Sequence, residues 1–266
     1  DVYKRQKMRS VNLYNRIVIK IGSALLAKPN GSVNHEILSA ISEDIAWLLK
    51  KNKEVLVVSS GAIALGRKKI QLSQKFSLAE SQAMAAHGQI ELMSAWKKHL
   101  NKFSIPIGQM LLTPRDTELK VSSKNAKQTV SKLIEAGCLP IINENDSTAT
   151  DEIKFGDNDL LAAKVAKLIN ADLLIVLSTV EGLYSSEDDL KANKSSAIIK
   201  QVTKITPNIR KMAGHASDMG KGGMVSKIDA AEICLKNKCA MVITSGKNKK
   251  PIRGLLSRTT ATWFTK

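Results

Sequence analysis

The stretch VIKIGSALL at residues 18–26 constrains the fold more than any other part of the chain. It joins a β-branched apolar run to a glycine and a serine, which is typical of a buried strand that ends in a tight turn. Lys20 stands inside the apolar run, where an unpaired charge is costly, so it needs an anionic partner or a ligand. Gly22 would let a phosphate approach the backbone. A lysine that snorkels from the strand end to solvent remains an open alternative.

Further apolar runs have the length and composition of buried parallel strands. They are VLVV (55–58), IPIGQM (105–110), LPII (139–142), LLIVL (173–177) and AMVI (240–243). Apolar residues recur at helical spacing between them, in residues 35–51, 77–100, 125–136, 160–170 and 223–237. This alternation predicts an α/β protein, a three-layer α/β/α sandwich around a central, mainly parallel sheet. Ligands of such sheets bind beyond the carboxyl ends of the strands.

The charge of the chain suggests an anionic partner at first sight. Its 266 residues include 41 Lys and Arg against 24 Asp and Glu, a formal net charge of +17. The lysines are spread along the whole chain, however, and aromatic residues make up only 4% of it, so few surfaces could stack nucleic-acid bases. We therefore expect a lysine-rich, solvated surface and no nucleic-acid partner.

The sequence also bears on location. No apolar run reaches the roughly 20 residues that a membrane span needs. The N-terminus lacks the charged and apolar segments of a secretory signal. Cys138, Cys234 and Cys239 are odd in number and lack metal-ligand spacing, which is typical of reduced thiols. We expect a cytoplasmic protein with no membrane partner, in which residues 1–15 form an N-terminal extension and residues 1–7 are not native.

Polar and glycine-rich loops after the strands hold the candidate site. SSGAIALG (59–66) offers backbone donors for an anion at a helix start, although an ordinary helix cap explains it too. NEND (143–146) and FGDND (155–159) suggest polar turns, a metal site or a site for an amino group, and helix capping alone would explain Asp159. GKGGMVSK (220–227) is a glycine-rich loop that could cradle phosphates, but it is not a Walker A motif.

Taken in chain order, these loops resemble the amino acid kinase family. The matching stretches are VIKIGSALL, SSGAIALG, GQMLLT (108–113), PIINEND (140–146), EIKFGDND (152–159), EGLY (181–184) and GKGGMVSK. PIINEND followed by FGDND resembles the members that act on glutamate. The resemblance implies ATP-dependent phosphorylation of the side-chain carboxylate of L-glutamate to L-glutamyl 5-phosphate, the first step of proline biosynthesis. It also implies ATP with Mg²⁺, the metal being carried by the ATP phosphates.

The resemblance implies roles for individual residues. The catalytic residues would be Lys20 and Lys227, which bracket the transferring phosphoryl group, and Asp159, which orients both lysines. The substrate-binding residues would be Ser60, Gly61, Asp146 and Asn158. The ATP-binding residues would be Lys20, Gly22, Ser178, Thr179, Lys221, Gly222, Gly223, Met224, Val225, Ser226 and Lys227. Thr179 departs from the aspartate that the family often carries there, which bears on one nucleotide contact. A glutamate carboxylate has a pKa of about 4.3 and needs no general base.

The resemblance further implies that residues 16–266 form a single catalytic domain without the C-terminal PUA domain of many bacterial members. Feedback inhibition by proline and a homo-oligomer, a dimer or a tetramer, are expected as well. Two alternatives are another small-acid or phosphate kinase of the same fold and, in a different class, a catalytically silent basic binding protein.

Overall fold

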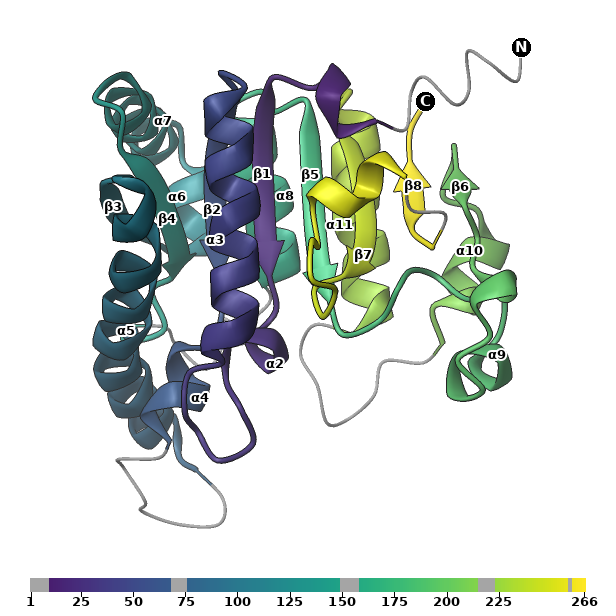
Figure 1. Ribbon diagram of the computed structural model, residues 1–266, viewed down its shortest axis with the longest axis horizontal. Coiled ribbons are helices and arrows are strands. Elements are labelled where there is room, and N and C mark those ends of the chain that lie inside the picture. The colour runs from purple at the N-terminus through teal and green to yellow at the C-terminus, as the bar shows by residue number, and fades with distance from the viewer. Residues whose placement is uncertain (1–9, 68–75, 149–157, 215–222, 258–259) are drawn as a thin grey trace.

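The computed structural model describes residues 10–67, 76–148, 158–214, 223–257 and 260–266 (Figure 1). A single sheet in this part of the chain has the strand order β3-β4-β2-β1-β5-β7-β8-β6. Its strands are β1 (Arg16–Ile21), β2 (Glu54–Ser59), β3 (Ile107–Leu112), β4 (Leu139–Glu144), β5 (Leu173–Ser178), β6 (Gln201–Val202), β7 (Ala240–Ser245) and β8 (Thr262–Phe264). Neighbouring strands pair in parallel, except that β7 and β8 are antiparallel. The expected mainly parallel sheet is confirmed.

Helices cover both faces of the sheet, which confirms the three-layer α/β/α sandwich. The helices are α2 (Ser23–Leu26), α3 (His35–Lys50), α4 (Ala62–Gly66), α5 (Leu78–Leu100), α6 (Pro114–Glu118), α7 (Lys120–Glu135), α8 (Asn158–Leu168), α9 (Glu187–Lys191), α10 (Pro207–Met212) and α11 (Met224–Lys236), with 3₁₀ turns at Val11–Leu13, Asn101–Phe103, Ser195–Ala197 and Arg253–Leu256. In Figure 1, α3 lies in front of the sheet, whereas α8 and α11 lie behind it.

The alternation of side chains along β1 explains the direction of Lys20. Ile17, Ile19 and Ile21 belong to the core cluster that includes the apolar face of α3. Val18 belongs to the opposite cluster, with buried residues of α8 and α11. Successive side chains of a strand point to opposite faces, so Lys20 shares the face of Val18. Its ammonium group is therefore directed toward α8 and α11.

Two glycines let helix α4 pack closely on helix α5. A Cβ atom at Gly88 would lie 1.8 Å from the carbonyl oxygen of Ala62, and one at Gly66 would lie 2.0 Å from that of Met84. Real Cβ atoms do not approach backbone that closely, so any other residue would push the helices apart. Helix α5 itself begins with a capping box, in which Ser77 Oγ accepts from Glu80 N and Ser77 N donates to Glu80 Oε2. The close packing of α4 on α5 holds the turn between β2 and α4.

The last third of the chain departs from the sequence expectations. Strands β6 and β8 were not expected, and neither was the short helix α9 in the polar segment 185–196. Strands of two and three residues are too short to show a period, and β6 pairs only with β8 in the described sheet.

Cys138, Cys234 and Cys239 carry free thiols. The described helices include none with the length and apolar character of a membrane span.

Candidate active site

A cavity of about 480 Å³ lies beyond the carboxyl ends of β1, β2 and β5. Its lining residues come from strand ends, turns and helices that are far apart in the sequence: Lys20, Gly22, Ser23, Ala24, Leu25, Ser60, Gly61, Ala62, Ile63, Ala64, Arg67, Asp146, Asn158, Leu177, Ser178, Thr179, Gly223 and Lys227. Strand β1 has β2 on one side and β5 on the other: the chain runs from β1 to β2 on the first side, and crosses from β4 to β5 on the second. Crevices form at such switch points in open α/β sheets.

Asp159 holds two lysines at one side of this cavity. Lys20 Nζ lies 2.6 Å from Asp159 Oδ1, and Lys227 Nζ lies 3.0 Å from Asp159 Oδ2. The side chain of Asp159 has no exposed surface, and those of both lysines are 7% exposed. One carboxylate therefore fixes two ammonium groups, and the three side chains carry a net single positive charge.

The lysines keep Asp159 ionised. Burial by itself raises the pKa of a carboxyl group, because it disfavours the charged form. For Asp159, the attraction of Lys20 and Lys227 together with their hydrogen bonds outweighs burial and holds the pKa below its usual value. The carboxylate is thus a permanent anchor for both ammonium groups near neutral pH.

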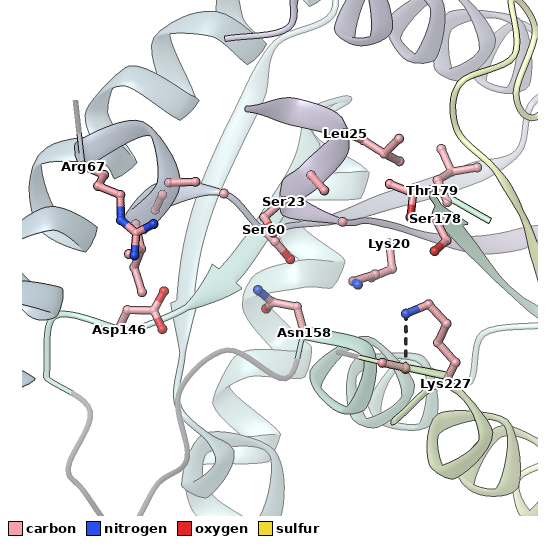
Figure 2. A pocket seen from close by; sticks show the side chains of 18 residues that line it. Lys20, Ser23, Leu25, Ser60, Arg67, Asp146, Asn158, Ser178, Thr179 and Lys227 are labelled. Atoms are coloured by element: carbon pink, nitrogen blue, oxygen red, sulfur yellow. Dashed lines mark hydrogen bonds between the residues drawn. The ribbon is translucent and has the colours of Figure 1, made fainter. Parts of the chain in front are cut away.

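Lys227 lies in the first turn of helix α11. Its Nζ also lies 3.5 Å from the carbonyl oxygen of Gly223, the residue before the helix, as the dashed line in Figure 2 marks. The backbone N–H groups at a helix start and the helix dipole favour an anion there. The helix start and the two lysines together form a positively charged wall suited to phosphate groups.

A second group of polar residues lies away from the lysines. Figure 2 shows Asp146 on the far side of the cavity and Asn158 and Ser60 between it and Lys20. Gly61 follows Ser60 with φ +112°, a left-handed conformation that favours glycine, and so turns the chain from β2 into α4. All four predicted substrate-binding residues line the cavity.

Asn143 is a positioning residue that the sequence analysis missed. It lies at 2% exposure in β4, and its Oδ1 accepts from Asn158 Nδ2 at 3.2 Å and from Glu144 N at 2.9 Å. Its Nδ2 donates to Gln89 Oε1 of helix α5 at 2.9 Å. Asn143 therefore ties the side chain of Asn158 to α5. It stands inside the quoted PIINEND stretch, but nothing in its spacing separated it from an ordinary turn residue.

Trp96 supports the same edge of the sheet from the other face. Its indole Nε1 donates to Ser59 Oγ at 3.0 Å, and both residues are buried. Ser59 is the last residue of β2 and precedes Ser60. Arg67 also lines the cavity and was missed, because one arginine in a chain rich in basic residues gives no distinguishing signal.

The predicted ATP-binding residues Lys20, Gly22 and Lys227 line the cavity, and the ATP-binding roles stay predictions. The backbone N–H of Gly22, expected to face a phosphate, donates instead to Leu177 O at 3.2 Å, because it prolongs the pairing of β1 with β5. Met224, Val225 and Ser226 are not among the residues that line the cavity, and Ser226 Oγ faces Asp159 Oδ2 at 3.5 Å. Gly223, Ser178 and Thr179 do line it. Lys221 and Gly222, like residues 152–157 of the EIKFGDND stretch, lie outside the described residues.

The chemistry of these groups suits a polyanion better than a bare metal ion. The polar groups at the lysine end are cations and helix N–H donors, which bind phosphate oxygens. In the part of the chain that the structure describes, no three His, Cys, Asp or Glu side chains come together as metal ligands. Asp159 is engaged by the two lysines.

Comparison with known proteins identifies the class to which this fold and site belong. The model of the amino acid kinase family matches residues 15–245. The chain therefore belongs to the amino acid kinase family, which confirms the resemblance drawn from its motifs. The crystal structure of UMP kinase from Ureaplasma parvum superposes with a TM-score of 0.66 at 19% identity, covering 95% of this chain and 99% of that one. At this identity the likeness concerns the fold alone.

Curated relatives with higher identity are glutamate 5-kinases. The glutamate 5-kinase of Allorhizobium ampelinum is 49% identical over 259 residues, which cover 97% of this chain and 66% of the relative. That of Rhizobium etli strain CFN 42 is 47% identical over 253 residues, 94% of this chain and 64% of the relative. The chain thus spans just under two thirds of the length of these relatives.

Proposed function

We propose that the protein transfers the γ-phosphoryl group of ATP to the side-chain carboxylate of L-glutamate, as a glutamate 5-kinase. The observation that carries the proposal is the placement of two buried ammonium groups on Asp159 beside a cavity that also contains Ser60, Asp146 and Asn158. The identity of 47–49% to glutamate 5-kinases supports it.

The reaction requires positioning and charge neutralisation more than proton transfer. A side-chain carboxylate is ionised at neutral pH and needs no base, but it must approach the negatively charged triphosphate. Lys20 and Lys227 would hold the oxygens of the transferring phosphoryl group and neutralise the charge that develops there. Asp159 would keep both lysines fixed before substrate binds, so that no reorganisation is needed during transfer.

The opposite end of the cavity would hold the amino-acid head of glutamate. Asp146 is an anion suited to the α-ammonium group. Asn158 and Ser60 offer hydrogen-bonding groups between Asp146 and the lysines. The side-chain carboxylate would then point toward Lys20, which places the acceptor oxygen next to the phosphoryl group.

ATP would lie along β5 and the start of α11. Ser178 ends β5 at the cavity and Thr179 follows it; both would contact the nucleotide, while Gly223 and Lys227 would face its phosphates. Thr179 cannot supply the negative charge of an aspartate at this position. Mg²⁺ enters the proposal as part of the MgATP substrate, bound by the phosphates, and supplies further positive charge when present.

The remaining expectations from the sequence stay predictions. Proline is proposed as a feedback inhibitor that competes in the glutamate region, and a homo-oligomer, dimer or tetramer, as the assembly. Sedimentation of the purified chain and inhibition kinetics with proline test them. The single catalytic domain at residues 16–266, the cytoplasmic location and the first step of proline biosynthesis stay predictions in the same way.

A screen of acceptors by ADP release tests the proposed function. We expect MgATP turnover with L-glutamate and little with L-aspartate, N-acetyl-L-glutamate or UMP. Turnover with one of the other acceptors while glutamate is inert would favour another small-acid or phosphate kinase. No turnover with any acceptor, together with salt-sensitive binding of oligonucleotides, would favour a catalytically silent basic binding protein.

A further inference from the structure

Arg67 lines the cavity at the end that faces Asp146. It follows the last residue of helix α4 and shares the cavity lining with Ser60, Asp146 and Asn158. Figure 2 shows its guanidinium group directed toward Asp146, on the side of the cavity away from Lys20 and Lys227. The cavity therefore has basic side chains at both ends.

Arg67 has close packing on one side and an aromatic ring on the other. Gly66, the preceding residue, packs on the backbone of Met84 so closely that a Cβ atom would lie 2.0 Å from the Met84 carbonyl oxygen. The guanidinium carbon lies 4.6 Å from the centroid of the Phe76 ring, which is within cation–π distance. The first contact fixes the backbone of Gly66, next to Arg67, and the second places an aromatic ring against the guanidinium group.

Arg67 differs from the two lysines of the cavity in its charge partners among the described residues. Of the described residues that line it, the charged ones are Lys20, Arg67, Asp146 and Lys227. Both lysines are paired with Asp159. Within the described part of the chain, Arg67 forms no ion pair with any carboxylate at 4.0 Å or less. Its guanidinium group and the Asp146 carboxylate present opposite charges on the same side of the cavity.

Such a pair of opposite charges matches the head group of an α-amino acid. A zwitterion carries an ammonium and a carboxylate on one carbon, and its recognition requires an anion and a cation side by side. We propose that Arg67 binds the α-carboxylate of the substrate and is a specificity-determining residue, which selects 2-amino dicarboxylates over acids that lack the α-carboxylate. This inference rests on the proposed function, in which the side-chain carboxylate occupies the lysine end.

A comparison of two acceptors tests the role of Arg67. L-Glutamate has the α-carboxylate, and 4-aminobutyrate is the same molecule without it. Acyl phosphate formation with each acceptor is measured for the wild-type chain, Arg67→Ala and Arg67→Lys. Lys28→Ala is the matched control, because Lys28 lines a neighbouring cavity with Arg67 and does not line this one.

Arg67→Ala is expected to lower kcat/KM for glutamate by about 10- to 100-fold, the effect of losing a charge-assisted hydrogen bond. The loss should arise in KM for glutamate, with KM for ATP and kcat/KM for 4-aminobutyrate nearly unchanged. Arg67→Lys should retain part of the preference for glutamate, since it keeps the charge without the planar fork of donors. Lys28→Ala should behave as wild type.

The ratio of kcat/KM for the two acceptors separates recognition from structure. A loss of stability, visible in a thermal melt, would lower both activities together and leave the ratio in place. An unchanged ratio in active Arg67→Ala, or an effect confined to ATP, would overturn the inference and leave the proposed function standing. If the wild-type chain does not phosphorylate glutamate at all, the proposed function fails and this inference fails with it.

Discussion

Lys20 Nζ lies 2.6 Å from Asp159 Oδ1, so that the central strand β1 and helix α8 are joined by an ion pair at the edge of the cavity. Both side chains are almost completely removed from solvent, and Lys227 shares the same carboxylate from helix α11. A buried pair of this kind costs desolvation energy and is poor evidence for stability by itself. Its value here is that it holds two cations at the edge of the cavity, where the proposed polyanionic substrate would bind.

Asp159→Asn should destabilise the fold as well as lower activity. The change leaves two buried ammonium groups without their counter-ion, and breaking a buried pair typically costs about 3–5 kcal/mol. Urea unfolding monitored by circular dichroism measures the loss. The control is Glu118→Gln, which removes a surface ion pair with Lys164 and should cost about 1 kcal/mol or less. Equal losses for the two variants would contradict the anchoring role of Asp159.

The lowered pKa of Asp159 also determines how the stability of the fold changes at acid pH. Its stabilisation is fully present above the ordinary carboxyl pKa of 3.8 and is lost as the pH falls through the lowered folded-state pKa. Asp159→Asn should therefore lack this part of the acid-induced loss of stability. An acid unfolding curve of identical steepness in wild type and variant would contradict this.

Asn143→Ala should weaken glutamate binding without touching the phosphoryl-transfer groups. It removes the acceptor that orients Asn158 and leaves the amide of Gln89 without its partner in the described structure. We expect KM for glutamate to rise by about tenfold, as for one lost hydrogen bond, with little change in KM for ATP. The exposed Asn125→Ala is the control. A change in kcat alone, or in KM for ATP alone, would contradict a positioning role.

Gly88→Ala tests the packing that holds the turn before α4. The new Cβ would meet backbone at 1.8 Å, so α4 and α5 must separate, at an expected cost of about 1–3 kcal/mol or more. Because α4 carries Gly61 at its start, KM for glutamate should rise too. Gly108→Ala is the matched control, since its new Cβ meets the terminal methyl of Leu133 at 2.5 Å, and that side chain can rotate away. If Gly88→Ala behaves like Gly108→Ala, the close packing is unimportant.

The contact between His35, the first residue of α3, and His99 of α5 predicts a pH dependence of stability near neutrality. His35 Nδ1 and His99 Nε2 lie 3.0 Å apart, and burial, with further effects of Lys102, His35 and Lys98, lowers the pKa of His99 from 6.5. The folded state thus binds this proton less readily than the unfolded chain. Stability should be full above pH 6.5 and decline as the pH falls toward the lowered pKa.

Urea unfolding between about pH 7.5 and about pH 5 measures that decline. His99→Gln removes the titrating group and should flatten the dependence, whereas the control His87→Gln should keep it. A slope that survives in His99→Gln would show that another group causes it.

The sequence predicted the six longer strands of the described sheet, β1 to β5 and β7. Strands such as RIVIKI at 16–21 are long and apolar enough to be recognised. It missed β6 and β8, which have two and three residues and depend on tertiary pairing. The sequence pattern left open whether Asp159 only caps a helix, since no local signal tells that Lys20 and Lys227 converge on it. Arg67 and Asn143 were missed for a related reason: their importance lies in tertiary neighbours, the cavity wall near Asp146 for Arg67 and the side chains of Asn158 and Gln89 for Asn143.

Trapping of the acyl phosphate tests the central claim most directly. L-Glutamate, ATP and Mg²⁺ are incubated with the chain in hydroxylamine, and the glutamyl hydroxamate is measured for wild type, Lys227→Ala and the surface control Lys236→Ala. Loss of one cation from the transferring group should lower kcat by about 10²- to 10³-fold in Lys227→Ala, while its circular dichroism spectrum and that of the fully active control stay native. No hydroxamate from the wild-type chain, or near-normal kcat in Lys227→Ala, would contradict the account.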